Sequence, residues 1–213
     1  MFNLDFESLP KSKIIDVPAG PASFCSEAKA LGHRVVAVDP RYSETAHDLL
    51  EIGLEDIDYI NEKIRATSRQ RVWDFYKDPD DLKRKQKSYL KAFIDDFSSE
   101  HISENPYVFA SLPNLPFENN TFDYALSGHF LFSFHSQIGY SLTLDSIKEL
   151  TRIAKEVRIF PLKSNEQSRE SEFPEMRRLL DDLSLQKINY RIEDSAFEFQ
   201  KGANQVMTLT CER

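Results

Sequence analysis

Short apolar runs alternate with amphipathic stretches along the first forty residues. The apolar run at 13–17 stops abruptly at a Pro-Ala-Gly-Pro sequence (18–21), which predicts a buried strand followed by a tight turn. Residues 22–31 favour a helix that ends near Gly32, and β-branched residues at 34–40 predict a second strand. A strand, a helix and a strand within roughly thirty residues form a βαβ unit, whose right-handed crossover makes its two strands parallel.

The segment 41–100 has a different pattern. It is rich in charged residues, and its apolar positions recur at helical spacing, which predicts two or three amphipathic helices. The clearest of these positions are Leu49, Ile52, Ile57, Ile60 and Ile64. A doubly wound fold needs fewer residues between its second and third strands, so this segment is interpreted as a helical insertion and a candidate lid.

Strand patterns return after the insertion and alternate with two further helices. The expected strands are 107–110, 121–127, 156–162, 187–193 and 204–211, and the expected helices are 144–154 and 173–183. The last two strands are separated by a hairpin-like sequence at 201–204. This order predicts one domain over residues 1–213, an α/β three-layer Rossmann-like sandwich with a mostly parallel sheet and an antiparallel C-terminal hairpin.

Composition narrows the class of protein. The 213 residues are 40% hydrophobic and 29% charged, which suffices for a real core. A net charge of −8 disfavours a nucleic-acid binder, because no bulk positive field attracts phosphates. Two cysteines and a start without a basic, apolar leader predict a cytoplasmic protein. The uncharged stretch 124–144 contains Ser, His, Gln and Gly and is therefore expected to be buried in protein and not in a membrane.

Candidate chemistry lies at the first strand-to-helix turn, because ligands of open α/β sheets bind beyond the carboxyl ends of strands. Gly20 lacks a Cβ and allows close approach of a cofactor, and the helix that follows offers unpaired N–H groups near Ser23. Asp39 ends the second strand about twenty residues later, where an acid accepts hydrogen bonds from ribose hydroxyls. The five histidines are scattered, and no Cys/His spacing predicts a metal site.

Several of these residues together resemble a known family. The run Asp-Val-Pro-Ala-Gly-Pro-Ala-Ser (16–23), then Asp39, Leu-Pro-Phe (115–117) and Phe-Asp (122–123) are similar to the Rossmann-like (class I) S-adenosylmethionine-dependent methyltransferases. The resemblance extends in order from about residue 13 to residue 162, and the run 115–123 is its most specific part. It implies S-adenosylmethionine as cofactor and a methyl acceptor, expected to be a small molecule. The chain departs from the family at Pro18, at Ala22 and at Ser111, where glycines and an acid are usual.

The resemblance also implies roles for individual residues. Asp16 and Gly20 would hold the methionine end of the cofactor, and Asp39 would bind the ribose. The implied cofactor-binding set is Asp16, Pro18, Gly20, Ser23, Asp39, Pro40, Ser111, Leu112 and Ser127, with Tyr42 beside Pro40 near the adenine. His129, just past the fourth strand, is the candidate general base, and a hydrogen-bonded pocket histidine is the alternative.

Other hypotheses remain open on the residues alone. A methyltransferase-like domain without catalysis, acting as a binding or scaffolding module, is motivated by the altered turn. A nicotinamide-dependent oxidoreductase is disfavoured, because the turn lacks three glycines. Aromatic residues at 130, 132 and 134 are interpreted as core or as the wall of an acceptor pocket. A basic stretch from 63 to 91 is interpreted in one of two ways. It is either a solvated helix face paired with nearby aspartates, or a functional surface, namely a lid over the acceptor site that favours anionic substrates or a patch for tRNA or a partner.

Overall fold

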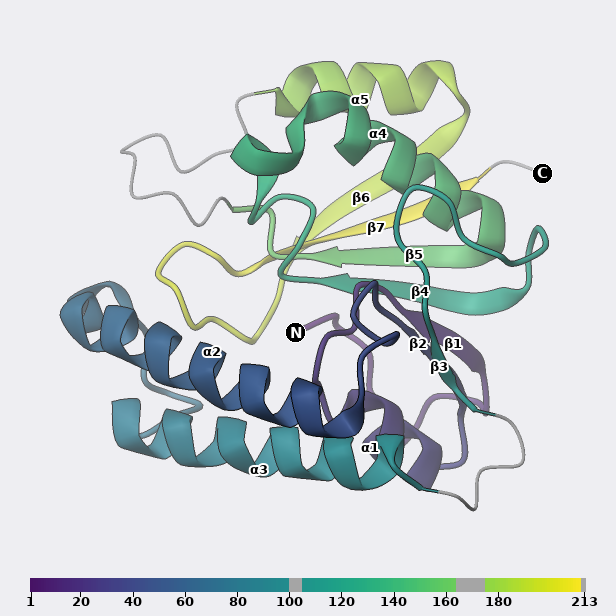
Figure 1. The fold of residues 1–213 in the computed structure, drawn as a ribbon. Helices are drawn as coiled ribbons and strands as arrows, with labels where there is room; N and C mark the ends of the chain where they lie inside the picture. The colour runs from purple at the N-terminus through teal and green to yellow at the C-terminus, as the bar shows by residue number, and fades with distance from the viewer. Residues whose placement is uncertain (100–104, 164–174, 212–213) are drawn as a thin grey trace.

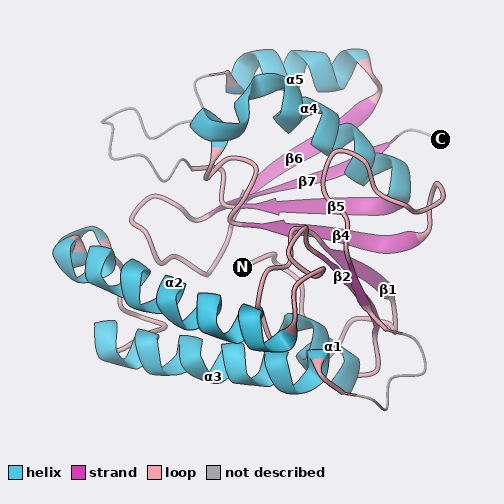
Figure 2. Ribbon diagram, viewed as in Figure 1, coloured by secondary structure: helices cyan, strands magenta, loops and turns pink. Residues whose placement is uncertain are grey.

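A computed structural model describes residues 1–99, 105–163 and 175–211 and contains one seven-stranded sheet (Figures 1 and 2). The strands lie in the order β3-β2-β1-β4-β5-β7-β6. Their bounds are β1 Lys13–Asp16, β2 Arg34–Val38, β3 Tyr107–Val108, β4 Phe122–Gly128, β5 Ala154–Phe160, β6 Ile188–Asp194 and β7 Gln205–Cys211. The helices are α1 Phe24–Ala30, α2 Ala46–Ala66, the short 3-10 turn η1 Ser68–Gln70, α3 Pro79–Phe97, α4 His135–Ile153 and α5 Met176–Leu185.

The sheet is parallel except at its last strand. Ile15 of β1 pairs with Val36 of β2 on one side and with Ala125 of β4 on the other, both in parallel register. Only β7 runs antiparallel, between β5 and β6. The expected Rossmann-like sandwich with a mostly parallel sheet and an antiparallel C-terminal hairpin is therefore confirmed.

Helices cover both faces of the sheet. In Figure 2, α1, α2 and α3 lie below the sheet and α4 and α5 lie above it. Successive side chains of a strand point to opposite faces of the sheet, so β1 contributes to the core on both faces. Ile14 packs into the cluster on the α1–α3 side, and Ile15 packs into the cluster on the α4–α5 side. Both isoleucines are fully buried, and the expected strand at 13–17 is confirmed.

The segment 41–100 forms two long helices, as its spacing predicts. Side-chain oxygens of Thr45 and Asp78 accept backbone N–H bonds at the starts of α2 and α3. The buried stripe of α2 is Leu49, Gly53, Ile57, Asn61 and Ile64. The expected stripe was wrong at Ile60, which is 43% exposed, because the helix turns a glycine and an asparagine toward α3 instead. That these helices constitute an insertion and a lid stays a prediction.

Two other elements differ from expectation. The helix α4 begins at residue 135, nine residues before its predicted start at 144, because an additional first turn is joined across Gly139, whose φ of 74° is not helical. Part of the helix predicted at 173–183 lies outside the described residues, which resume before α5. The uncharged stretch 124–144 comprises most of β4, a turn and the first half of α4, and none of the described helices is long and apolar enough to span a membrane.

Candidate functional site

The turn after β1 is bonded to the end of β2. The N–H of Ala19 donates to the carbonyl of Val38 at 2.9 Å, which extends the pairing of the two strands past their ends. Gly20 follows with a φ of +56°, a left-handed conformation that glycine adopts without steric penalty. No heavy atom lies within 4 Å of the position that a Cβ on Gly20 would take, so the turn has open space beside it.

Asp39 holds this turn through its carboxylate. One oxygen, Oδ2, accepts the N–H of Gly20 at 2.9 Å, and Oδ1 accepts the N–H of Arg41 at the same distance. The residue is only 6% exposed. A carboxylate offers about four lone-pair positions, so each oxygen retains one for a further donor. Asp39 therefore stabilises the turn and can still accept hydrogen bonds from a ligand bound next to it.

Asp16 lies at the end of β1, and its carboxyl group has no hydrogen bond or ion pair with any described residue. Burial and, to a smaller extent, the negative charge of Asp39 together raise the pKa of this carboxyl to about 7. Two acids therefore share one end of the sheet without a neutralising cation, which favours a positively charged ligand there.

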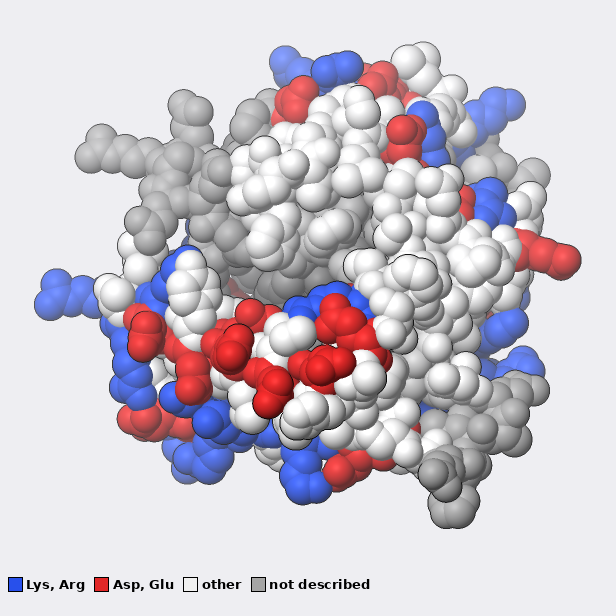
Figure 3. Space-filling view, viewed as in Figure 1, with Lys and Arg blue, Asp and Glu red and all other residues white. Residues whose placement is uncertain are grey.

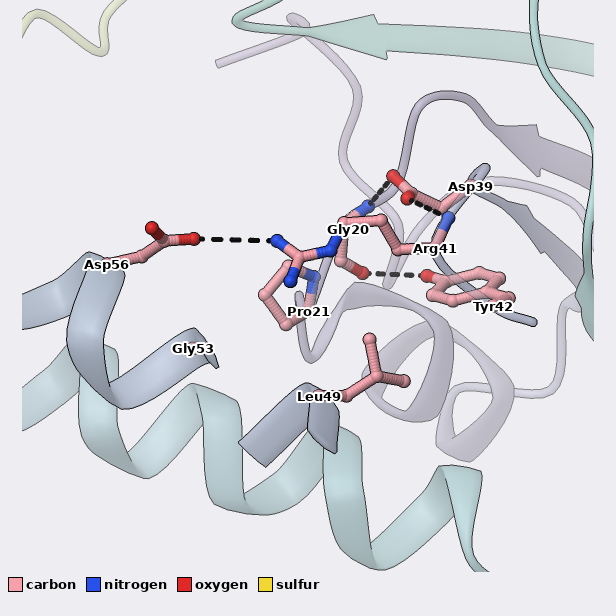
Figure 4. A pocket seen from close by; sticks show the side chains of 8 residues that line it. All are labelled: Gly20, Pro21, Asp39, Arg41, Tyr42, Leu49, Gly53 and Asp56. Atoms are coloured by element: carbon pink, nitrogen blue, oxygen red, sulfur yellow. Dashed lines mark hydrogen bonds and ion pairs between the residues drawn. The ribbon is translucent and has the colours of Figure 1, made fainter. Parts of the chain in front are cut away.

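A pocket opens beside the turn (Figure 4). It encloses about 270 Å³ including open solvent, and its walls come from the turn, the end of β2 and α2. The lining residues are Gly20, Pro21, Asp39, Arg41, Tyr42, Leu49, Gly53 and Asp56. Across its mouth, the Arg41 guanidinium and the Asp56 carboxylate form an ion pair at 3.6 Å.

The contribution of α2 to this pocket was missed by the reasoning from sequence. Leu49, Gly53 and Asp56 follow one another at spacings of four and three residues along one face of α2, and they reach the pocket only because α2 crosses beneath the turn. A Cβ on Gly53 would lie 2.7 Å from Cδ1 of Leu90, so glycine allows α2 to pack closely on α3. A single glycine inside an apolar helical stripe was the available signal for such a close approach.

Tyr42 acts as a brace at the base of the pocket. Its hydroxyl donates to the carbonyl of Gly20 at 2.7 Å. Its ring stacks on Phe93 with centroids 5.8 Å apart and meets Tyr107 edge-on at 5.4 Å. The ring expected beside the adenine is thus packed among aromatic side chains, and only the hydroxyl end faces the turn.

The other residues predicted around the turn differ in accessibility. Pro18 is half-buried between β1 and the turn, and Pro40 is exposed next to Asp39. Ser23 is buried, and its hydroxyl donates to Oε1 of Glu27 at 2.7 Å within the first turns of α1. The Ser23 hydroxyl is therefore engaged inside the protein.

Ser111 and Leu112 lie in the loop after β3, on the far side of β2 from Gly20. Ser111 is exposed and forms an isolated bridge with Asn114, and Leu112 is half-buried between them. Phe109, just past β3, is 63% exposed and was not singled out from the sequence. An exposed aromatic ring at this edge is available for stacking on a planar group.

The end of β4 carries the last two predicted residues. Ser127 is fully buried, and its hydroxyl has no hydrogen-bond partner among the described residues. His129 has a φ of 55°, and its N–H donates to the carbonyl of Phe160 at 2.6 Å. The imidazole meets the Phe160 ring edge-on with centroids 5.6 Å apart while the residue stays exposed, and partial loss of hydration together with the positive charge of the N-terminus lowers the pKa of His129 below its ordinary value. Neither residue lines the pocket beside Gly20.

Comparison with known proteins gives a relative along nearly the whole chain. No family model matches the sequence. The uncharacterized protein MJ0045 of Methanocaldococcus jannaschii is 31% identical over 210 residues, which cover 98% of this chain and 90% of that protein. The chain belongs to the MJ0045 family.

Similar solved structures bear on the fold of this chain. A TehB-like SAM-dependent methyltransferase from Corynebacterium glutamicum superposes with a TM-score of 0.50 at 12% identity, over 97% of this chain and 83% of that one. The magnesium protoporphyrin IX methyltransferase of Synechocystis PCC 6803 superposes with a TM-score of 0.49 at 9% identity, over 96% and 72%. The first match and the strand order together show the class I fold of S-adenosylmethionine-dependent methyltransferases.

In this member of the MJ0045 family the aromatic residues after β4 divide between core and surface. Phe132 is buried, Phe130 is half-buried and Phe134 is exposed. The core interpretation therefore holds for Phe132 and in part for Phe130, which packs against the same cluster. Among the residues that the structure describes, no three His, Cys, Asp or Glu side chains gather as a metal site would require.

Proposed function

We propose that this MJ0045-family protein is an S-adenosylmethionine-dependent methyltransferase that acts on a small molecule. The observation that carries the proposal is the pair of acids, Asp16 and Asp39, at the carboxyl ends of β1 and β2. Neither carboxylate has a Lys or Arg partner among the described residues. S-adenosylmethionine carries a sulfonium and an ammonium group, and such charges would offset the repulsion between the two acids.

The same charges argue against a nicotinamide cofactor. A dinucleotide brings a negatively charged diphosphate to the first strand-to-helix turn, where it needs backbone N–H groups and no facing acid. Here the N–H of Gly20 already donates to Asp39, and Asp16 lies at the end of the preceding strand. This arrangement favours a cationic ligand over a diphosphate.

The residues around the turn fit the cofactor in three further respects. Gly20 has open space beside it, Asp39 keeps acceptor positions for ribose hydroxyls, and the exposed Phe109 and Ser111 lie beyond the neighbouring strand. Pro18 departs from the family pattern and contributes no N–H. On these grounds we assign the cofactor to the carboxyl ends of β1 and β2.

When bound, the cofactor supplies a methyl group already activated on a positively charged sulfur, and the protein contributes alignment and exclusion of water. A base is needed only where the attacking atom of the acceptor must lose a proton. His129 is proposed for this role. Its lowered pKa leaves the imidazole neutral near pH 7, and a neutral imidazole can accept the proton.

Calorimetric titration with S-adenosylmethionine and S-adenosylhomocysteine tests the cofactor assignment. We expect micromolar binding, and we expect Asp39→Ala to weaken it by one charge-assisted contact, about 10- to 150-fold. Asp5→Ala, at an exposed acid that does not line the pocket, is the control and should bind as the wild type does. Folded protein that binds neither compound would exclude the proposal.

A methyltransferase-like module without catalysis is the second candidate, favoured by Pro18 in the turn and by the buried Ser127. Transfer of a labelled methyl group to small molecules of a lysate separates the two. An active enzyme should show transfer that slows in His129→Ala while the affinity for S-adenosylhomocysteine is unchanged. Binding without any transfer would support the module.

A further inference from the structure

Two connections that are far apart in the sequence are joined to each other. They are residues 67–78, between α2 and α3, and residues 195–203, between β6 and β7, and we call them together the clasp. The N–H of Val72 donates to the carbonyl of Phe199 at 2.8 Å, and the N–H of Lys201 donates to the carbonyl of Gln70 at 3.0 Å. Arg71 and Gln200 face each other in the antiparallel bridge between these bonds.

Aromatic side chains reinforce the clasp. The ring of Phe199 lies 5.6 Å from Trp73 and 5.5 Å from Tyr76, both edge-on. Phe75 meets Phe197 at 5.5 Å in the same manner. The clasp is therefore a packed unit and not a chance approach of two loops.

The clasp lies at the carboxyl ends of the central strands. The ring of Phe197 lies 6.0 Å from that of Phe160 at the end of β5, and Phe160 in turn contacts His129. Figure 1 shows both connections on the side of the molecule where β4 and β5 end. This is the side on which a methyl acceptor would bind, if the proposed function holds.

Arg71 is a cation without a counter-ion in this clasp. Its Nε is buried and has no hydrogen-bond partner among the described residues, and its Nη2 donates only to Oγ1 of Thr67 at 3.3 Å. The guanidinium lies 5.5 Å from the centroid of the Phe199 ring. Burial lowers the pKa of Arg71, and no described carboxylate compensates for the lost hydration.

Other cations of the basic stretch 63–91 differ from Arg71 in this respect. Lys83 forms an ion pair with Asp58 at 2.9 Å, and Lys85 pairs with Asp81 at 3.5 Å. These pairs support the interpretation of a solvated helix face for α2 and α3. They leave Arg71 as a cation that this interpretation does not explain.

Two lysines lie at the clasp: Lys201, which is part of it, and Lys163, whose side chain contacts its backbone. The Nζ of Lys163, just past β5, donates to the carbonyl of Lys201 at 2.5 Å. Neither lysine has an ion pair with an acid in the described part of the chain. The nearby carboxylate of Glu198 already accepts the N–H of Gly202 at 2.6 Å. Three basic residues thus belong to the clasp or contact it, in a protein whose net charge is −8.

We propose that Arg71 and Lys163 bind an oxyanion, a carboxylate or a phosphate, that the methyl acceptor carries. This inference rests on the proposed function for the identity of the ligand. A guanidinium presents paired donors that match either group, and burial strengthens the bond. Figure 3 shows a row of acidic side chains along α2. That part of the surface repels an anion, whereas the clasp attracts it.

The single tryptophan of the chain, Trp73, lies inside the clasp and reports on it. Its fluorescence is to be followed during titration with sodium phosphate and with sodium citrate, at constant ionic strength set with sodium chloride. We expect a saturable change with at least one of the two anions. Arg71→Gln and Lys163→Gln should each weaken that binding at least tenfold, and Arg71→Lys should weaken it less.

Arg69→Gln is the matched control, because Arg69 is an exposed arginine two residues away with no part in the clasp bonds. It should titrate as the wild type does. Saturation by phosphate alone or by citrate alone identifies which oxyanion the site takes. The inference is overturned if neither anion gives a saturable change, or if Arg69→Gln weakens binding as much as Arg71→Gln.

Calorimetry with S-adenosylhomocysteine on the same variants separates this inference from the proposed function. We expect its affinity to be unchanged in Arg71→Gln. Anion binding without any binding of S-adenosylhomocysteine would leave the oxyanion site standing and exclude the methyltransferase. Binding of S-adenosylhomocysteine without an anion response would overturn the oxyanion site alone.

Discussion

Asp16 should make the protein less stable as the pH rises. The pKa of its carboxyl is about 7 in the folded protein and 3.8 in a free side chain, so the folded state holds the proton more tightly. Between these two values the folded state binds more protons than the unfolded state, and the free energy of unfolding falls with rising pH. Above about pH 7 the loss is complete.

The magnitude follows from the shift. About three pKa units at about 1.4 kcal/mol each correspond to about 4 kcal/mol. The side chain is only half-buried, and water screens part of the charge, so we expect about 2 to 4 kcal/mol. Asp16→Asn keeps the shape of the side chain and removes the ionisation. It should therefore be more stable than the wild type by this amount at pH 8 and nearly equal to it near pH 4.

Urea unfolding followed by circular dichroism at several values between pH 4 and pH 8 measures the difference. Asp123→Asn is a control of opposite sign. Asp123 accepts the N–H of Lys13 and a bond from Lys155, which lower its pKa, so its contribution to stability is lost as the pH falls. The variant should be less stable than the wild type at pH 8. A difference between Asp16→Asn and the wild type that stays constant across the range would refute the reasoning.

Three further changes test the architecture of the site. Gly20→Ala should lower the free energy of unfolding by about 1–2 kcal/mol because its φ of +56° disfavours a Cβ, and an unchanged melting temperature would contradict this conformation. Tyr42→Phe should cost about 1 kcal/mol of stability through the lost bond to Gly20 while the affinity for S-adenosylhomocysteine is retained; a large loss of affinity would instead mean that the hydroxyl contacts the cofactor. Gly53→Ala should destabilise by about 1–3 kcal/mol in chemical denaturation through overpacking on Leu90, and this cost should shrink when Leu90→Ala is combined with it; additive costs would rule out the contact.

Strands and helices could be predicted from the sequence wherever a short run of residues by itself favours one of them. The apolar run before Gly20 and the β-branched run before Asp39 gave the first βαβ unit, because burial on both faces of a parallel strand needs continuous apolar residues. The same spacing placed Asp39 at the end of β2, beside the turn that it holds. The prediction was wrong where the sequence carries no clear periodicity. At the start of α4, Gly139 separates a first helical turn whose residues show no apolar spacing, so the predicted helix began too late.

Local residue patterns specify the helices and strands, their order and the positions of Gly20 and Asp39. The surroundings of these two residues depend on how distant segments pack together. The raised pKa of Asp16 depends on the packing of β1 between β2 and β4, and the wall of the pocket depends on how α2 crosses beneath the turn. The clasp joins Arg71 to Gln200, a contact between segments that no local pattern relates. Periodicity records which face of an element is buried, whereas the identity of the neighbour is set by the packing of the whole chain.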